Sequence, residues 1–331
     1  MMTRLLGALA LMIGLATAAL ADFRPAIVYD LGGRFDKSFN EAAFNGAQIF
    51  QAETNIEVAD FELQNDTQRE QALRNFARRG MDPIIAIGFS HAAAVEVVAR
   101  EFPDTRFAII DMVVDLPNVR SIVFKEQEGS FLVGVLAAMA SETGTVGFVG
   151  GMDIPLIRRF ACGYVQGVRS VNPEAVVLQN MTGTTGAAWT DPVRGGELAR
   201  GQFAQGADVV YHAAGGTGIG VLQAAADAGL LGIGVDSNQN YLHPGHVLTS
   251  MLKRVDTAVV DTFMAAMNGE WTTGVTVLGL AEEGVGYALD EYNRDLVTPE
   301  METAVNAAAE AIIAGSVTVH DYMADETCPV E

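Results

Sequence analysis

The sequence predicts an α/β fold of the doubly wound type, arranged as two lobes. Short apolar runs alternate along the chain with amphipathic stretches of helical length. Such runs are typical of parallel strands in a sheet that is covered on both faces. The alternation changes near residues 121–131 and again near 246–255, which indicates that the chain crosses between two lobes there.

Each expected strand is a short apolar run between turn residues, and each expected helix is an amphipathic stretch. The strands are predicted at residues 26–29, 83–88, 107–110, 145–149, 208–211 and 232–235, with 121–124 and 247–250 as the strands at the crossings. The helices are predicted at residues 39–52, 67–79, 91–102, 156–171, 192–205 and 219–228. Ligands of open α/β sheets bind beyond the carboxyl ends of the strands, so the strand ends are where a site is expected.

Composition excludes several classes of protein. The chain has 331 residues, of which 50% are apolar, and this is ample for a large core and unlike a disordered chain. It carries 20 Lys and Arg residues against 41 Asp and Glu residues, a net charge of −21. Because non-specific affinity for nucleic acid comes from Lys and Arg, we expect no nucleic-acid partner.

The N-terminus has the pattern of a secretory signal. Arg4 supplies a positive charge, residues 5–15 are apolar, and small residues lead to Ala19-Leu20-Ala21. This pattern predicts residues 1–21 as a signal peptide that is cleaved after Ala21. Position 22 is Asp and not the Cys that a lipid anchor requires, so we expect a free periplasmic protein.

Two cysteines, Cys162 and Cys328, remain in the mature chain. In an oxidising compartment they could form one disulfide that pins the C-terminal tail to the body of the protein. A buried thiol and an exposed thiol are the alternative, and the sequence leaves both open.

Polar residues follow several of the predicted strands. Asp30, Asp111 and Asp236 each come directly after an apolar run, and a glycine-rich stretch, 215–220, follows the strand at 208–211. A single Asp at this place is commonly a helix cap. Three of them in the same position favour a shared cleft at the strand ends.

These residues lie in motifs that resemble the basic membrane protein family. The motifs are Asp30-x-Gly-Gly-x-x-Asp36-Lys-Ser-Phe39-Asn40, residues 146–155, Ala214-Gly-Gly-Thr-Gly218, Val235-Asp-Ser, Ser250-Met-Leu-Lys253, Gly279-Leu and Gly284-Val-Gly286. The resemblance runs from about residue 25 to about residue 315 with the motifs in the family's order. The family comprises substrate-binding proteins of ABC importers, and its best-known members are similar to purine nucleoside receptors.

The resemblance implies a type I periplasmic-binding-protein fold with two lobes, three crossings and a hinge. On this basis lobe 1 is expected to comprise residues 22–122 and 254–278, and lobe 2 residues 123–253 and 279–331. The expected partners are a small-molecule ligand and an ABC permease in the inner membrane. We expect a monomer that is not an enzyme and needs no cofactor or metal.

The resemblance also implies roles for single residues. Phe39 would be the platform on which a base stacks, with Asp30, Asn40 and Asp111 as neighbouring polar contacts. Asp236 and Lys253 would hold the ribose, and the backbone of Gly215 and Gly216 would approach the ligand. The second aromatic is expected at Tyr211 or, alternatively, at His212. Asn238 stands where many relatives have Asp, which leaves the sugar contact open.

The physical chemistry of these residues favours a nucleoside over a nucleotide, because several carboxylates around the single cation Lys253 would repel a phosphate group. Trp189 and Trp271 are interpreted as packing or surface residues, and His243 and His246 as too few ligands for a metal site.

Two alternatives remain. The first is a binding protein for a sugar, a free nucleobase or a small signal molecule, because fold does not determine ligand. The second is an NAD-dependent dehydrogenase, suggested by the glycines at 215–220 with Asp236 following. The dinucleotide fingerprint would need a glycine at Val221, and the stretch lies late in the chain.

Overall fold

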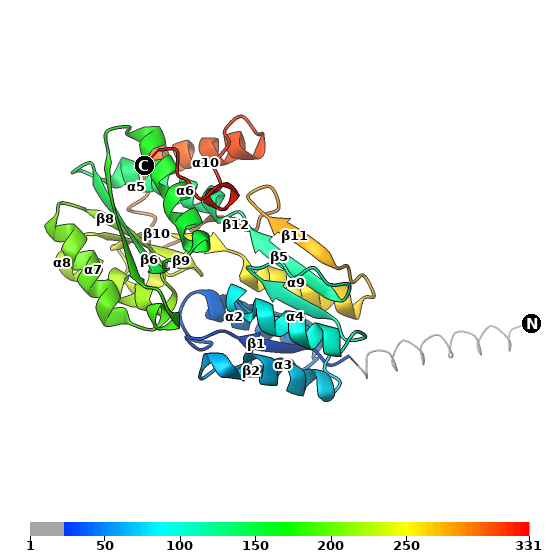
Figure 1. Cartoon of the computed structure of the whole chain (residues 1–331). Helices are drawn as coiled ribbons and strands as arrows, with labels where there is room; N and C mark the ends of the chain where they lie inside the picture. The colour runs from blue at the N-terminus through cyan, green and yellow to red at the C-terminus, as the bar shows by residue number, and fades with distance from the viewer. Residues whose placement is uncertain (1–22, 331) are drawn as a thin grey trace, which may run out of the picture. The chain divides into compact units, whose positions relative to one another are not determined.

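The computed structural model describes residues 23–330, which form two compact units and two six-stranded sheets (Figure 1). Unit 1 comprises the described part of Met1–Asp30 with Gly46–Ile122 and Ala258–Thr276. Unit 2 comprises Leu31–Asn45, Val123–Thr257 and the described part of Val277–Glu331. The expected signal peptide lies outside the described residues, and the expected lobe boundaries stay a prediction.

The first sheet has the strand order β11-β5-β4-β3-β1-β2. Its strands are β1 (Ala26–Tyr29), β2 (Ala59–Glu62), β3 (Ile84–Ala86), β4 (Phe107–Ile110), β5 (Val119–Phe124) and β11 (Gly274–Leu278). The helices that accompany it in the chain are α2 (Phe39–Thr54), α3 (Arg69–Arg78), α4 (Ala92–Glu101) and α9 (Val255–Met267). Neighbours from β2 to β5 pair in parallel, and every residue of β1, β3 and β4 is buried.

The second sheet has the order β12-β10-β9-β8-β6-β7. Its strands are β6 (Thr145–Met152), β7 (Val176–Gly183), β8 (Val209–Ala213), β9 (Leu231–Asp236), β10 (Val247–Lys253) and β12 (Val285–Tyr287). The helices of this part are α5 (Glu126–Ala140), α6 (Pro155–Val171), α7 (Pro192–Ala204), α8 (Gly218–Ala228) and α10 (Pro299–Ile313). All described pairs in this sheet are parallel except β10 with β12.

Helices cover both faces of the second sheet, as β8 illustrates. Toward α6, the ring of Tyr211 packs against Tyr164, with 5.2 Å between ring centroids. On the opposite face, Val210 belongs to an apolar cluster with α7 and α8 that contains Val149, Ala199, Val221 and Ala224. Because neither face meets water, every residue of β8 is buried, including His212.

The α/β prediction is confirmed, and the strands that the sequence did not predict share one property. All eight predicted strands are inner strands of the two sheets, whereas β2, β7, β11 and β12 are the four edge strands. The edge strand β7 is only partly buried along its length. A strand that is exposed on one side needs no continuous apolar run, so it leaves a weaker pattern in the sequence.

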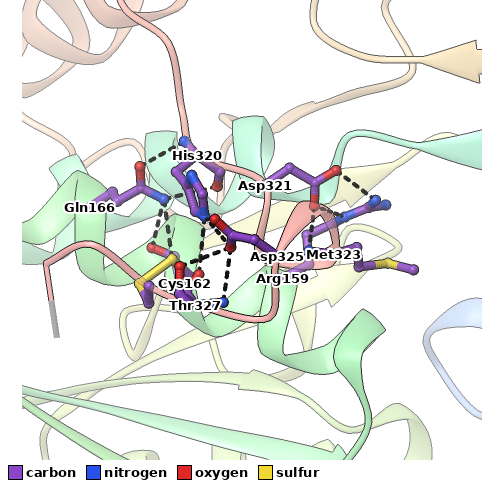
Figure 2. Close-up of polar contacts among 9 residues, drawn as sticks. Arg159, Cys162, Gln166, His320, Asp321, Met323, Asp325 and Thr327 are labelled. Atoms are coloured by element: carbon purple, nitrogen blue, oxygen red, sulfur yellow. Dashed lines mark hydrogen bonds and ion pairs between the residues drawn. A yellow bond between two sulfur atoms is a disulfide. The ribbon is translucent and has the colours of Figure 1, made fainter.

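The C-terminal tail is fastened to α6. Cys162 and Cys328 form a disulfide with an S–S distance of 2.10 Å, which decides between the two alternatives for these cysteines. The side chain of Gln166, one turn further along α6, donates to the carbonyl of His320 and accepts its N–H (Figure 2). We refer to residues 320–328 as the C-terminal strap.

None of the helices within residues 23–330 combines the length and the apolar character that a membrane span requires.

Helices α5 and α6 meet at glycines that let their backbones approach closely. A Cβ atom on Gly167 would lie 2.1 Å from the carbonyl oxygen of Phe131. On Gly134 it would lie 2.4 Å from the carbonyl oxygen of Tyr164. Real side chains do not tolerate such distances, so any larger residue would push the two helices apart.

We therefore expect Gly167→Ala to lower the free energy of unfolding by about 1–3 kcal/mol, because the added methyl group forces α6 away from α5. Gly201→Ala in α7 is the matched control, since nothing lies within 4 Å of its Cβ position. That change should stabilise the protein by about 0.5–1 kcal/mol through helix propensity. Urea unfolding followed by circular dichroism measures both, and equal effects would contradict the close-contact interpretation.

Candidate functional site

The turn that follows β1 is held by one buried carboxylate at the start of α2. Asp36 accepts the backbone N–H groups of Ser38 at 2.9 Å, Asn40 at 3.0 Å and Glu41 at 3.1 Å. Burial raises the pKa of Asp36, and the three N–H donors oppose that shift. This carboxylate caps the helix, so the backbone of Phe39, its first residue, has a defined position.

Asn40 braces the same turn from inside. Its side-chain nitrogen donates to the Asp36 carboxylate at 3.2 Å and to the carbonyl of Leu31 at 3.4 Å. The structure therefore gives Asn40 a role in shaping the turn, whereas the expected contact with a ligand stays a prediction.

A second turn of unit 2, after β9, is tied to the first. The hydroxyl of Ser38 donates to the carboxylate of Asp236, and the hydroxyl of Ser237 donates to the carbonyl of Ser38 at 2.8 Å. The Gln239 amide donates to the carbonyl of Lys37 at 2.9 Å. Asp236 is 8% exposed and has a φ of +63°, in the left-handed region that non-glycine residues rarely adopt. Phe39 and Asp236 are thus held on neighbouring turns.

Lys253 at the end of β10 is a buried cation in an aromatic cage. It is 2% exposed, and its ammonium pairs with Glu126 at 2.9 Å. The ammonium nitrogen also lies over three rings, 5.1 Å from the centroids of Phe39 and Phe124 and 5.6 Å from that of Phe160. Cation–π attraction of this kind strengthens where water is excluded, so Lys253 helps to orient the Phe39 ring.

The glycine turn after β8 makes room for an aromatic residue. A Cβ on Gly216 would lie 3.2 Å from the carbonyl oxygen of Trp189 and 3.8 Å from the Cβ of Asp36. Gly215 has a φ of +54°, in the region that favours glycine. The half-buried Trp189 therefore lies beside both this turn and the turn that carries Phe39.

Unit 1 carries two further predicted residues, Asp30 and Asp111, at the carboxyl ends of its strands. Asp30, after β1, pairs with Arg69 at 2.7 Å and accepts the hydroxyl of Ser90. Asp111, after β4, has a φ of +70°, and its backbone N–H donates to the carbonyl of Ile122 at 2.8 Å. One strand, β3, separates β1 from β4, so their ends are roughly 10 Å apart across the sheet.

A cavity of about 320 Å³ lies next to Asp236 in unit 2. It is lined by Glu41, Ala42, Asn45, Asp236, Ser237, Asn238, Tyr241, Leu252, Arg254 and Asp256. The amide of Asn238 donates to Asp290 at 2.6 Å, so this residue secures the turn. Among residues 23–330, no three His, Cys, Asp or Glu side chains are placed to hold a metal ion.

Comparison with known proteins assigns this architecture to a family. The family model described as "ABC transporter substrate-binding protein PnrA-like" matches residues 24–321. The chain belongs to the Bmp family. Its members are substrate-binding proteins of ABC transporters.

Two relatives and one solved structure illustrate the similarity. A CD4+ T-cell-stimulating antigen of Listeria monocytogenes is 34% identical, over 90% of this chain and 88% of that protein. The ABC transporter nucleoside-binding protein BmpA of Lactococcus lactis is 33% identical, over 90% and 89%. An ABC transporter solute-binding protein of Aeropyrum pernix superimposes with a TM-score of 0.83 at 28% identity, over 90% and 93%.

For this Bmp-family chain, the structure argues against Tyr211 as a ligand-facing ring. Tyr211 is fully buried in unit 2, its hydroxyl lies 3.3 Å from that of Ser130, and burial raises its pKa. Its ring is enclosed by Phe148 and Tyr164, which leaves no face for a base. Tyr211 is expected as the second aromatic because the family resemblance implies one, but a buried strand does not reveal from its sequence which of its residues face a ligand.

The alternative, His212, is also a core residue. It points to the opposite face of the sheet, where its Nε2 lies 2.9 Å from the Gln239 side chain. A Cβ on Gly218 would lie 1.9 Å from the His212 ring, and one on Gly220 would lie 1.8 Å from the carbonyl oxygen of Pro192. These glycines therefore serve close packing of α8. Together with the family assignment, this argues against the dinucleotide-binding alternative.

Burial lowers the pKa of both His212 and His91 from 6.5 to about 4. The unfolded chain binds these protons more readily than the folded one, so the free energy of unfolding should fall as the pH drops from about 6.5 to about 4. Each histidine contributes at most about 1.4 kcal/mol per pH unit. We expect His212→Gln to make this pH dependence shallower by that amount.

Urea unfolding at a series of pH values measures the two slopes. Above pH 7 the side chain at position 212 is neutral in both the parent protein and the His212→Gln variant. Their free energies of unfolding should therefore change with pH in parallel above pH 7, which serves as the control. An unchanged slope between pH 4.5 and 6.5 would show that His212 does not stay neutral in the folded state.

Proposed function

We propose that this protein captures a nucleoside, with purines preferred, in the periplasm and delivers it to the permease of an ABC importer. The observation that carries the proposal is the placement of an aromatic ring and a carboxylate on two neighbouring turns that are hydrogen-bonded to each other. A nucleoside presents the complementary pair of groups, a flat base and a ribose diol. The printed name of the Lactococcus lactis relative supports the same ligand class.

Phe39 is the proposed platform for the base. It begins α2, its backbone is fixed by the Asp36 cap, and its ring is oriented by the ammonium of Lys253. A platform that is already ordered before binding loses little entropy when a base stacks on it. Stacking of a base on an aromatic ring contributes about 1–3 kcal/mol.

Asp236 is the proposed acceptor for the ribose hydroxyls. A carboxylate can accept both hydroxyls of a vicinal diol, and such charge-assisted bonds contribute about 1.5–3 kcal/mol each. The Ser38 hydroxyl orients this carboxylate from the Phe39 side. Free bases and 2′-deoxynucleosides lack part or all of the diol and should bind more weakly.

The charge of Lys253 supports an uncharged ligand. The carboxylate of Glu126 lies 2.9 Å from the ammonium and offsets its positive charge. A second carboxylate, that of Asp236, lies on the turn after β9, which is hydrogen-bonded to the Phe39 turn. A phosphate group would meet these carboxylates without a surplus of positive charge. The proposed ligand is therefore a nucleoside and not a nucleotide.

We propose Trp189, instead of Tyr211, as the second aromatic residue of the site. Its half-buried ring packs over Gly151, and its backbone meets the Gly215-Gly216 turn, which itself touches Asp36 of the Phe39 turn. The proposed contributions of Asp30 and Asp111 from unit 1 rest on the sequence resemblance.

Isothermal titration calorimetry with adenosine, guanosine, inosine, 2′-deoxynucleosides, free bases and ribose tests the proposal. We expect at least one purine ribonucleoside to bind, and Phe39→Ala to weaken that binding by about 1–3 kcal/mol because the stacking surface is lost. Phe35→Ala is the matched control, since this ring is 63% exposed on the same turn and contacts Arg34 and Phe44 instead of Lys253.

The other outcomes of the titration distinguish the alternatives. Tight binding of ribose without nucleosides would indicate a sugar receptor. Equal affinities for free bases and nucleosides would show that Asp236 does not bind the ribose hydroxyls, and would indicate a nucleobase receptor. If no compound binds, the nucleoside proposal is wrong.

Tryptophan fluorescence tests the second aromatic independently. The chain has two tryptophans, and Trp271 lies in unit 1 between Arg106 and Arg120. In a Trp271→Phe variant, the emission of Trp189 should change in proportion to bound nucleoside, because a stacked base alters the surroundings of its ring. A Trp189→Phe variant, which keeps Trp271, is the control and should respond weakly. Equal fluorescence changes in the two variants would show that Trp189 is not part of the ligand site.

A further inference from the structure

A continuous chain of ion pairs leads from the Phe39 cage to the C-terminal strap. Glu126 contacts Lys253 through one carboxylate oxygen at 2.9 Å and Arg159 through the other at 2.8 Å. Arg159 in turn pairs with Asp321 of the strap. Side-chain exposure rises along this chain from 1% at Glu126 to 12% at Arg159 and 33% at Asp321. All four residues belong to unit 2.

Glu126 is one of the groups that fix the position of the Lys253 ammonium. A buried carboxylate needs nearby cations to offset its lost hydration, and here Lys253 lies beside one oxygen while Arg159 donates a hydrogen bond to the other. If Arg159 did not occupy one oxygen, Glu126 could rotate and draw the ammonium of Lys253 with it. The position of that ammonium over the Phe39 ring therefore depends on Arg159.

Arg159 is itself held rigidly by groups that approach from two directions. Its Nε and Nη2 donate to the two carboxylate oxygens of Asp321 at 2.7 and 2.8 Å, and its Nη1 donates to the carbonyl of Phe124 at 2.9 Å. A planar guanidinium that makes a two-point contact has little freedom to move. Figure 2 shows the Arg159 and Asp321 side chains facing each other at the strap.

The strap fixes Asp321 from both sides. His320, just before it, exchanges two hydrogen bonds with Gln166, and Cys328 closes the other end through the disulfide to Cys162 (Figure 2). Arg159, Cys162 and Gln166 are spaced three and four residues apart on α6, so they share one face of the helix. The strap thus lies along the face of α6 from which Arg159 projects.

We propose that the C-terminal strap is a positioning element of the ligand site, in which Asp321 holds Arg159, and Arg159 together with Glu126 holds Lys253 against Phe39. This rests on the proposed function, because it takes Lys253 and Phe39 to contact the ligand. Asp321 and Arg159 are positioning residues, since they act on the ligand through Glu126 and Lys253. The disulfide keeps Asp321 in place without touching the site.

The main test is Asp321→Asn, which keeps the size of the side chain and removes its charge. We expect this variant to bind the nucleoside identified by calorimetry about 3- to 10-fold more weakly than the parent protein. Glu302→Gln is the matched control, because it also removes the charge from one carboxylate of an ion pair in unit 2, with Arg294 at 2.6 Å, and lies outside the strap. Its affinity should stay within about 1.5-fold of the parent, a difference too small to count as coupling.

A spectroscopic measurement without ligand separates positioning from general loosening. A buried ammonium that is paired with a carboxylate gives a ¹H–¹⁵N correlation, which can be assigned to Lys253 through its side-chain carbons. We expect this signal to shift in Asp321→Asn and in a Cys162→Ala/Cys328→Ala double variant, and to stay unchanged in Glu302→Gln.

A double-mutant cycle gives a second check. In a Lys253→Met background, Asp321→Asn should cause no further loss of affinity, because its effect passes through Lys253. Equal losses in both backgrounds, or an Asp321→Asn protein with unchanged affinity and an unchanged Lys253 signal, would overturn the positioning role. If the parent protein binds no nucleoside, the proposed function fails, and the Lys253 signal still decides whether the strap positions this residue.

Discussion

The organisation of the candidate site depends on one buried interaction, the pairing of Glu126 with Lys253. Removing two charges from water costs several kcal/mol per ion, and this cost is offset only where the partners are close and the remaining polar atoms are satisfied. Here the carboxylate has a second cation, Arg159, and the ammonium lies over three aromatic rings. The pair therefore constrains the Phe39 ring on one side and α6 on the other, and links residues that are far apart in the sequence.

The two turns around this pair are ordered by hydrogen bonds within unit 2. Asp36 caps α2, Ser38 and Ser237 join the turn after β1 to the turn after β9, and Asn40 braces the first turn from inside. Groups that are held in this way before a ligand arrives lose little freedom on binding. For the proposed uncharged ligand, such order adds to affinity, because the ligand offers no strong charge for the protein to attract.

Burial explains which parts of the fold the sequence could predict. The eight inner strands are covered on both faces, so each is a short apolar run that stands out between helices. The edge strands β2, β7, β11 and β12 are partly exposed and mix polar with apolar residues, which makes them resemble loops. The same reasoning applies to the second aromatic expected at β8. Both faces of this strand are buried, so the sequence alone does not show whether Tyr211 or His212 packs in the core.

The sequence by itself determined the α/β fold, the family and the approximate positions of the eight inner strands, because these follow from local periodicity and from motifs a few residues long. Its motifs also predicted Phe39, Asp236 and Lys253 as ligand contacts, and the structure places these three residues in one unit. Only the tertiary structure decided that Trp189 lies beside the glycine turn, that Cys162 pairs with Cys328, and that Glu126 joins Lys253 to Arg159 and the strap. These contacts join residues dozens to more than a hundred positions apart, and folding in three dimensions, not local pattern, brings such residues together.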